Sequence, residues 1–248
     1  MAAEHPTVEH RTADRRKAGR RRAEHQAVNH VPLTPLSLMR RTAEVFPSRT
    51  AVIYGTRRDS YATFFERVCR LANGLRRLGI GQGSKVALLC PNLPPMAEAH
   101  FGIPWAGGVI VAVNTRLNSR EVAFILTHSE SEVLLVDRGL LGTLRPVVDN
   151  LGGIRTILVA EDAAAGLDDG WRPPGALDYE AFLAAASPEP PPMALEDEEQ
   201  LIAIDYTSGT TGDPKGVMYT HRGAALGALS NLLQHGLDRN TVYLWTLP

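Results

Sequence analysis

The sequence predicts an α/β fold in which a largely parallel sheet is flanked by helices. Short, continuously apolar runs such as Val86–Cys90 and Val109–Val113 have the length and composition of strands that are buried on both faces. Segments with helical apolar spacing alternate with these runs from about residue 62 to residue 160. Regular alternation of strand and helix is typical of a parallel sheet covered on both faces.

Helix-start, periodicity and turn signals define the elements up to residue 90. Thr34-Pro35 opens a helix, because a hydroxyl residue followed by proline is typical of a helix start. Apolar residues at three- and four-residue steps define a longer helix, which ends at Gly79 because glycine enters the left-handed region cheaply. The expected elements are a helix over Pro32–Phe46, a hairpin of strand Thr50–Tyr54, loop 55–59 and extended segment Ser60–Tyr61, a helix Thr63–Leu78 and a strand Val86–Cys90.

Prolines and one capping pair punctuate the next seventy residues. Pro91 stops a strand, and Pro104 interrupts the end of a helix that begins at Pro94. Asn118 caps a helix, with Glu121 three residues later as its reciprocal partner. The expected elements are a helix Pro94–Ala106, a strand Val109–Val113, a helix after Asn118, a strand Glu132–Val136, a helix Leu140–Leu151 and a strand Thr156–Ala160.

Residues 1–30 form a basic arm, with seven Arg or Lys against four Asp or Glu. The arm has almost no large apolar residues, so we expect it to be disordered. A plain tail or an extension from an upstream start codon is the favoured interpretation. An RNA- or membrane-surface patch is the sharper alternative. A transit peptide fits poorly, because acids are present and serine is absent.

Composition changes divide the rest of the chain. Residues 31–160 are predicted to form a first α/β subdomain. Residues 161–199 are rich in proline and acids and read as a surface excursion or linker, with one short helix near Asp178–Ala186. Residues 200–248 are predicted to start a second subdomain. Its expected elements are a strand Leu201–Tyr206, a loop, an extended segment Gly216–Thr220, a helix Ala224–His235 and a strand-like piece Thr241–Pro248.

Bulk properties exclude several classes of protein. The 248 residues are 44% hydrophobic and 21% charged, which is ordinary for a chain with a real core. A net charge of −1 gives no electrostatic case for nucleic acid. There is no apolar run long enough for a transmembrane segment and no secretory signal. Cys69 and Cys90 match no zinc pattern and are expected to be buried, reduced thiols, which fits the cytoplasm.

The segment Tyr206–Gly216 carries the clearest chemistry. Glycines let backbone N–H groups turn onto an anion, and successive inward N–H groups make an anion-binding nest. Hydroxyls add donors, and a lysine adds a compact positive charge suited to phosphate. The sequence therefore predicts a polyphosphate-binding loop. Its candidate binding residues are Thr207, Ser208, Gly209, Thr210, Thr211, Gly212 and Lys215.

Two better-known phosphate motifs do not match this loop. The Walker A pattern requires Gly-Lys-Ser/Thr, whereas Lys215 lies between Pro214 and Gly216. The dinucleotide fingerprint also fails, because no Gly-x-Gly-x-x-Gly opens a helix after a strand. The remaining alternative is a Gly/Ser/Thr turn with one solvated lysine, which is disfavoured for eleven residues in this order.

The loop resembles the signature of the adenylate-forming superfamily, which includes acyl-CoA synthetases, luciferases and the adenylation domains of peptide synthetases. Other segments agree with this resemblance, which covers residues 31–248. They are Ser60–Phe64, Trp105–Gly108 with Val113–Asn118, and Met218–Gly223. The residues of these segments are most similar to those of the medium- and long-chain fatty acyl-CoA ligase branch.

The resemblance implies a two-step reaction. A carboxylate attacks the α-phosphate of ATP to give acyl-AMP and pyrophosphate, and a thiol, usually that of coenzyme A, then displaces AMP. It also implies that Thr207, Ser208, Thr210, Thr211 and Lys215 hold the β- and γ-phosphates, which Mg²⁺ bridges. The partner is a small-molecule carboxylate, and the oligomeric state is left open.

Several parts that the resemblance implies are not found in this sequence. These parts are an aromatic and histidine segment, an acidic magnesium segment, a ribose-binding aspartate segment and a C-terminal domain with a catalytic lysine. We therefore assign no catalytic residue and no protein metal ligand. His100, His128, His221 and His235 are taken as structural, and Glu196–Glu199 as a solvated acidic turn. A fragment of a CoA ligase, inactive alone, is the first hypothesis, and a stand-alone nucleotide-binding or interaction protein without turnover is the alternative.

Overall fold

A computed structural model describes residues 31–162, 170–193, 195–207 and 214–247. The chain divides into Met1–Pro32 and a compact unit Leu33–Pro248. The basic arm predicted over residues 1–30 lies outside the described residues. Everything below concerns the second unit.

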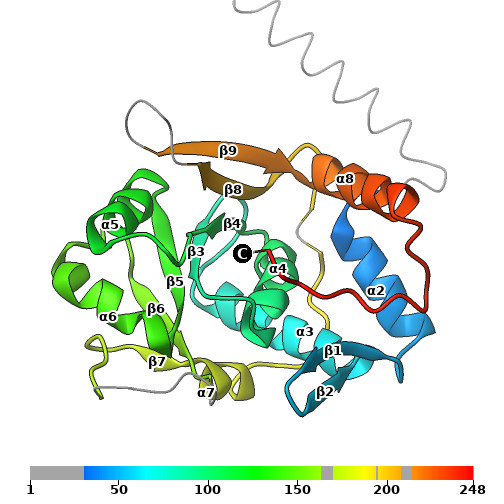
Figure 1. Ribbon diagram of the computed structural model, residues 1–248, viewed down its shortest axis with the longest axis horizontal. Coiled ribbons are helices and arrows are strands. Elements are labelled where there is room, and N and C mark those ends of the chain that lie inside the picture. Colours follow the sequence, from blue (N-terminus) through cyan, green and yellow to red (C-terminus); the bar gives the residue numbers. More distant parts are fainter. Residues whose placement is uncertain (1–30, 163–169, 194, 208–213, 248) are drawn as a thin grey trace, which may run out of the picture. The chain divides into compact units, whose positions relative to one another are not determined.

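The core of the unit is a seven-stranded sheet in the order β7-β6-β5-β3-β4-β8-β9 (Figure 1). All neighbouring strands are parallel except β8 and β9, which are antiparallel. The α/β class with a largely parallel sheet is therefore confirmed. The strands are β3 (Lys85–Leu89), β4 (Val109–Ala112), β5 (Ser131–Asp137), β6 (Thr156–Ala160), β7 (Leu177–Asp178), β8 (Leu201–Thr207) and β9 (Lys215–Thr220).

Helices cover both faces of this sheet, because its strands are apolar on both faces. Alternate residues of β3 enter different clusters: Val86 and Leu88 pack with α3 and α4, while Ala87 and Leu89 pack with α5 and α6. A separate hairpin of β1 and β2 packs beside α3 (Figure 1). These remaining elements are α2 (Pro35–Val45), β1 (Thr50–Tyr54), β2 (Arg57–Ser60), α3 (Tyr61–Arg77), α4 (Pro94–Ala106), α5 (Ser119–His128), α6 (Leu141–Leu144), α7 (Tyr179–Ala184) and α8 (His221–Gln234).

The predicted capping signals are confirmed where the structure describes them. Thr34 caps α2, and Asn118 forms a capping box with Glu121 at the start of α5. Pro104 does not interrupt α4, which continues to Ala106 and ends at Gly107, a residue with φ of 97°. The helix therefore ends where a left-handed residue is available.

Three predicted elements are wrong. Tyr61 does not continue the hairpin but begins α3, because the Ser60 side chain caps that helix. Leu140–Leu151 is not one helix but a series of short turns, η1 (Arg138–Leu140), α6 and η2 (Arg145–Asn150). Pro146 explains this break, because it has no N–H to donate to the carbonyl four residues earlier.

The third wrong element is the strand expected at Thr241–Pro248. Within the described residues, 241–247 pair with no strand. The Asn92 amide instead donates to the carbonyls of Trp245 and Leu247, at 3.1 and 2.7 Å. The segment forms one wall of an apolar pocket of about 680 Å³ whose other walls are the hairpin, α3 and α4. β9 is therefore one edge strand of the sheet, and β7 is the other.

The Pro- and acid-rich excursion at 161–199 contributes to the fold where it is described. β7 pairs with β6, Tyr179 of α7 is buried, and the Trp105 indole donates to the carbonyl of Pro191 at 2.9 Å. Helix α8 begins at His221 rather than Ala224, because Thr220 caps it. The subdomain boundaries near residues 160 and 200 stay predictions, while β8 lies in the same sheet as the strands before it.

Apolar side chains are exposed along β9 and α8. Only His221 and Ala225 of α8 are buried. Backbone groups of an edge strand that pair with nothing are a template for association with another chain. The exposed side chains are Val217, Met218, Tyr219, Leu226, Leu229, Leu232 and Leu233.

Candidate functional site

The candidate phosphate loop joins β8 to β9. Thr207 ends β8 and lies opposite Lys215, which begins β9. Both side chains are exposed. The loop ends are therefore held next to each other by an antiparallel ladder. The other five candidate residues lie outside the described residues: Ser208, Gly209, Thr210, Thr211 and Gly212.

The sheet topology places both loop ends on the side of the sheet where the parallel strands have their carboxyl ends. β8 runs parallel to β4, so Thr207 lies at the same edge as the ends of β3, β4 and β5. Lys215 is brought to this edge because β9 runs in the opposite direction. Ligands of open α/β sheets bind outside the carboxyl ends of their strands. The predicted strand–loop–extended topology is confirmed and fits this rule.

The base of the loop is closely packed. A Cβ built on Gly216 would lie 2.8 Å from Ile204 Cγ2 and 3.4 Å from Tyr206 Cζ, so only glycine fits there. The Tyr206 hydroxyl lies 2.7 Å from Nδ1 of His128, the last residue of α5. Burial raises the pKa of Tyr206, so its hydroxyl stays protonated at neutral pH.

A carboxylate lies two residues before Thr207, on the same face of β8 as Thr207 and on the opposite face from Tyr206. Asp205 is half-buried, and burial raises its pKa, while the charge of His100 opposes that rise. The His100 imidazole packs edge-on against Trp245, with ring centroids 5.7 Å apart. Sequence reasoning missed Asp205, although a charged residue inside an apolar strand was a visible signal.

A second polar group lies at the carboxyl ends of β3 and β5. The Tyr54 hydroxyl donates to Asp162 at 2.8 Å, and burial together with this bond raises the pKa of Tyr54 to about 12. Asp137 is buried, and its Oδ2 has no hydrogen-bond partner among the described residues. Burial raises the pKa of the Cys90 thiol well above its ordinary value. Such a thiol is not a nucleophile at neutral pH.

The cysteine prediction is confirmed, since both cysteines are free and buried. Burial also raises the pKa of Cys69, to about 12. Among the described residues, no group of three His, Cys, Asp or Glu could hold a metal ion. The acidic turn at Glu196–Glu199 is only partly solvated, because Glu198 accepts from the backbone N–H of Leu33 at 2.6 Å and pairs with Arg222.

His221 is structural, as predicted. It is 4% exposed, and its Nδ1 lies 2.9 Å from the hydroxyl of Thr34, the cap of α2. Burial lowers its pKa to about 4. The imidazole is therefore neutral at physiological pH and joins the starts of α2 and α8.

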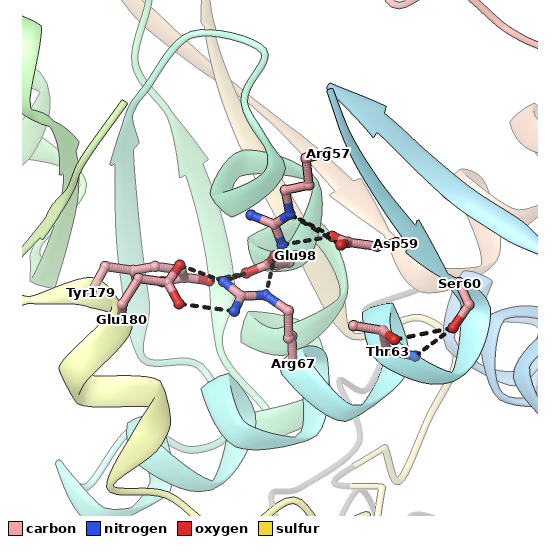
Figure 2. A network of polar contacts seen from close by, with 8 residues as sticks. All are labelled: Arg57, Asp59, Ser60, Thr63, Arg67, Glu98, Tyr179 and Glu180. Carbon is pink, nitrogen blue, oxygen red and sulfur yellow. Dashed lines mark hydrogen bonds and ion pairs between the residues drawn. The ribbon is translucent and has the colours of Figure 1, made fainter. Parts of the chain in front are cut away.

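A buried carboxylate joins α3, α4, α7 and the β1–β2 hairpin through a network of polar contacts (Figure 2). Glu98 of α4 is completely buried, and Arg67 of α3 donates to it through Nε at 2.6 Å and Nη2 at 3.1 Å. The Tyr179 hydroxyl donates to the same carboxylate at 2.7 Å, and Arg57 of β2 lies 3.4 Å away. Burial raises the pKa of Glu98, and the two arginines oppose that rise. The network joins four elements and holds no exposed reactive group.

No described helix is long and apolar enough to cross a membrane. Residues 39–248 match the family described as AMP-binding enzyme. A peroxisomal acetate/butyrate–CoA ligase of Arabidopsis thaliana is 43% identical over 229 residues, which cover 89% of this chain and 40% of that protein. A 4-hydroxybutyrate–CoA ligase of Metallosphaera sedula is 39% identical over 87% of this chain and 39% of its own length. The chain thus spans about two fifths of these relatives.

Solved structures agree with these matches. A long-chain-fatty-acid–CoA ligase from Archaeoglobus fulgidus superposes with a TM-score of 0.70 at 26% identity, over 84% of this chain and 41% of that one. An anthranilate CoA ligase crystallised with anthranoyl-AMP gives a TM-score of 0.68 at 25% identity, over 77% and 36%. The fold, the loop topology and the sequence matches lead to one conclusion: the chain belongs to the AMP-binding enzyme family, the adenylate-forming superfamily that its loop resembles.

Proposed function

We propose that the protein activates a carboxylic acid with ATP, forming an acyl-AMP, and then transfers the acyl group to the thiol of coenzyme A. The observation that carries this proposal is the position of the two residues at the ends of the loop. Thr207 and Lys215 lie opposite each other at the carboxyl ends of the parallel strands, in a chain whose relatives include proteins named as CoA ligases. A free carboxylate is a poor acyl donor because oxide is a poor leaving group, and AMP solves that problem.

The proposed role of the loop is to hold the β- and γ-phosphates while the α-phosphate is attacked. Lys215 supplies positive charge, and Thr207 supplies a hydroxyl donor from the opposite strand. Ser208, Thr210 and Thr211 would add donors, and Gly209 and Gly212 would let the backbone approach. Fixed donors of this kind act by positioning and by stabilising charge.

Mg²⁺ is proposed as the partner of the ATP phosphates. The described residues hold no group of three side chains that could bind a metal. The ion would be carried by the nucleotide phosphates. Its contribution when bound would be neutralisation of phosphate charge.

A fatty acid is the proposed substrate within the wider class of carboxylic acids. The named relatives act on acetate, butyrate and 4-hydroxybutyrate, and one structural neighbour is named for long-chain fatty acids. We propose the cytoplasm as the compartment, on the ground that both cysteines are free and buried. Several plant relatives carry peroxisomal names.

The 248-residue chain is proposed to bind ATP without forming acyl-AMP. It spans about two fifths of the relatives, and its loop addresses the β- and γ-phosphates rather than the reacting α-phosphate. Loss of one donor to a developing charge typically costs a hundred- to a thousandfold in rate, so several losses would abolish turnover.

Titration calorimetry with ATP tests the loop. Lys215→Ala removes a charged phosphate contact worth about 1.5–3 kcal/mol, so binding should weaken by roughly ten- to a hundredfold. Lys85→Ala is the matched control, because Lys85 begins β3 at the opposite edge of the sheet. Equal affinities of wild type and Lys215→Ala would refute the assignment. Carboxylate-dependent exchange of pyrophosphate into ATP, abolished by Lys215→Ala, would show instead that the chain works alone.

A further inference from the structure

Tyr206 lies at the base of the candidate loop and contacts both of its strands. It directly precedes Thr207, which ends β8. Its partner in the antiparallel ladder is Gly216, which follows Lys215. The missing side chain of Gly216 leaves room for the Tyr206 ring, whose Cζ would be 3.4 Å from a Cβ there. The ring therefore packs beside the backbone that presents the loop ends.

His128, on helix α5, contacts the hydroxyl end of the Tyr206 ring. The Tyr206 hydroxyl lies 2.7 Å from His128 Nδ1, and the two rings meet edge to face at 5.8 Å. Phe124, one turn earlier on α5, stacks on His128 with centroids 5.4 Å apart and an interplanar angle of 18°. The imidazole is thus held from two sides, although it lies at the surface.

Helix α5 is a firm support for this contact. Its first turn is closed by the capping box of Asn118 and Glu121, and Val122, Ile125 and Leu126 are fully buried beneath it. β8, in contrast, has only one buried residue, Ile202. The pairing of β8 with β4 extends to Asp205, so the contact between Tyr206 and His128 lies one residue beyond it, at the start of the loop.

We propose that Tyr206 and His128 are positioning residues for the nucleotide phosphates. They hold the β8–β9 hairpin against α5, and so fix the direction in which Thr207 and Lys215 meet the β- and γ-phosphates. Neither residue is assigned a contact with the nucleotide. This inference rests on the proposed function, since it needs the loop to bind a polyphosphate.

The test compares affinity with stability in matched variants of the full chain. Tyr206→Phe removes only the hydroxyl, and His128→Leu removes the partner nitrogen. A neutral hydrogen bond of this kind corresponds to a change of roughly two- to tenfold. We expect each variant to weaken binding of both ATP and inorganic pyrophosphate by about that factor, with a thermal midpoint within about 2 °C of wild type. The double variant should bind no more weakly than either single variant.

Two controls separate positioning from general structural damage. His128→Asn keeps a polar atom near the position of Nδ1 and should restore most of the affinity. Tyr219→Phe changes an exposed tyrosine of β9 and should have no effect.

Wild-type affinity in Tyr206→Phe, or a loss in His128→Asn equal to that in His128→Leu, would overturn the inference. The inference would also be overturned if the thermal midpoint fell so far that loss of folded protein explained the whole loss of affinity. If Lys215→Ala weakens ATP binding and Tyr206→Phe does not, only this inference fails. If Lys215→Ala has no effect, the proposed function fails first.

Discussion

Acid should destabilise the fold through His221. This imidazole is 4% exposed, and burial lowers its pKa from 6.5 to about 4 in the folded state. Between pH 6.5 and about pH 4, His221 is therefore protonated in the unfolded chain and neutral in the folded chain. The stabilisation is complete above that pH and is lost as the pH falls from 6.5 to about 4.

The magnitude follows from the size of the shift. A difference of about 2.5 pKa units corresponds to at most about 3.4 kcal/mol, of which about 2 kcal/mol is lost between pH 7 and pH 5. Most domains are stable by only about 5–15 kcal/mol, so this loss is large. Glu98 and Asp137 act in the opposite direction, because burial raises their pKa values and the folded chain holds their protons to higher pH.

A matched variant isolates the histidine from these carboxyls. His221→Asn cannot titrate, and its side-chain oxygen can still accept from the Thr34 hydroxyl. Urea unfolding at pH 7, 6 and 5 gives the free energy of unfolding of both proteins. We expect wild type to lose about 2 kcal/mol more than the variant between pH 7 and pH 5. Parallel pH curves for the two proteins would refute the reasoning.

Three further predictions concern packing and association. Glu98→Gln removes one of the two carboxylates that pair with the partly buried Arg67, and urea unfolding should show a loss of about 1–3 kcal/mol, whereas an unchanged midpoint would contradict the network. Gly102→Ala should cost about 1–3 kcal/mol, because its Cβ would lie 2.7 Å from Leu71, while Gly227→Ala, which meets nothing within 4 Å, should stabilise by up to about 1 kcal/mol. Met218→Lys on the β9 edge should reduce self-association in analytical ultracentrifugation, and an unchanged sedimentation profile would show that another surface associates.

Local signals predicted most of the elements. The apolar strand Val86–Cys90 and the capping pair Asn118–Glu121 both have their cause within a few residues. The broken helix after Leu140 could also have been found, because Pro146 is visible in the sequence.

Contacts between distant residues could not be predicted in this way. The Glu98 network draws on residues up to 81 positions away, and His128 meets Tyr206 across 78 positions. Both depend on the order of strands in the sheet, which no local pattern encodes. The loop was found for the opposite reason, since its chemistry is contained in eleven consecutive residues.

The hydrogen bonds that tie the start of α2 to Glu198 and to His221 of α8 have a consequence for how the chain folds during synthesis. Leu33 is bound to Glu198 and Thr34 to His221, over separations of 165 and 187 residues. Helix α2 is therefore synthesised well before its starting turn can meet these partners. β8 likewise joins β4 only after a long delay. Native contacts at such separations slow folding, so the start of α2 is fixed late, whereas its apolar side packs on α3 and α4, which follow it closely in the sequence.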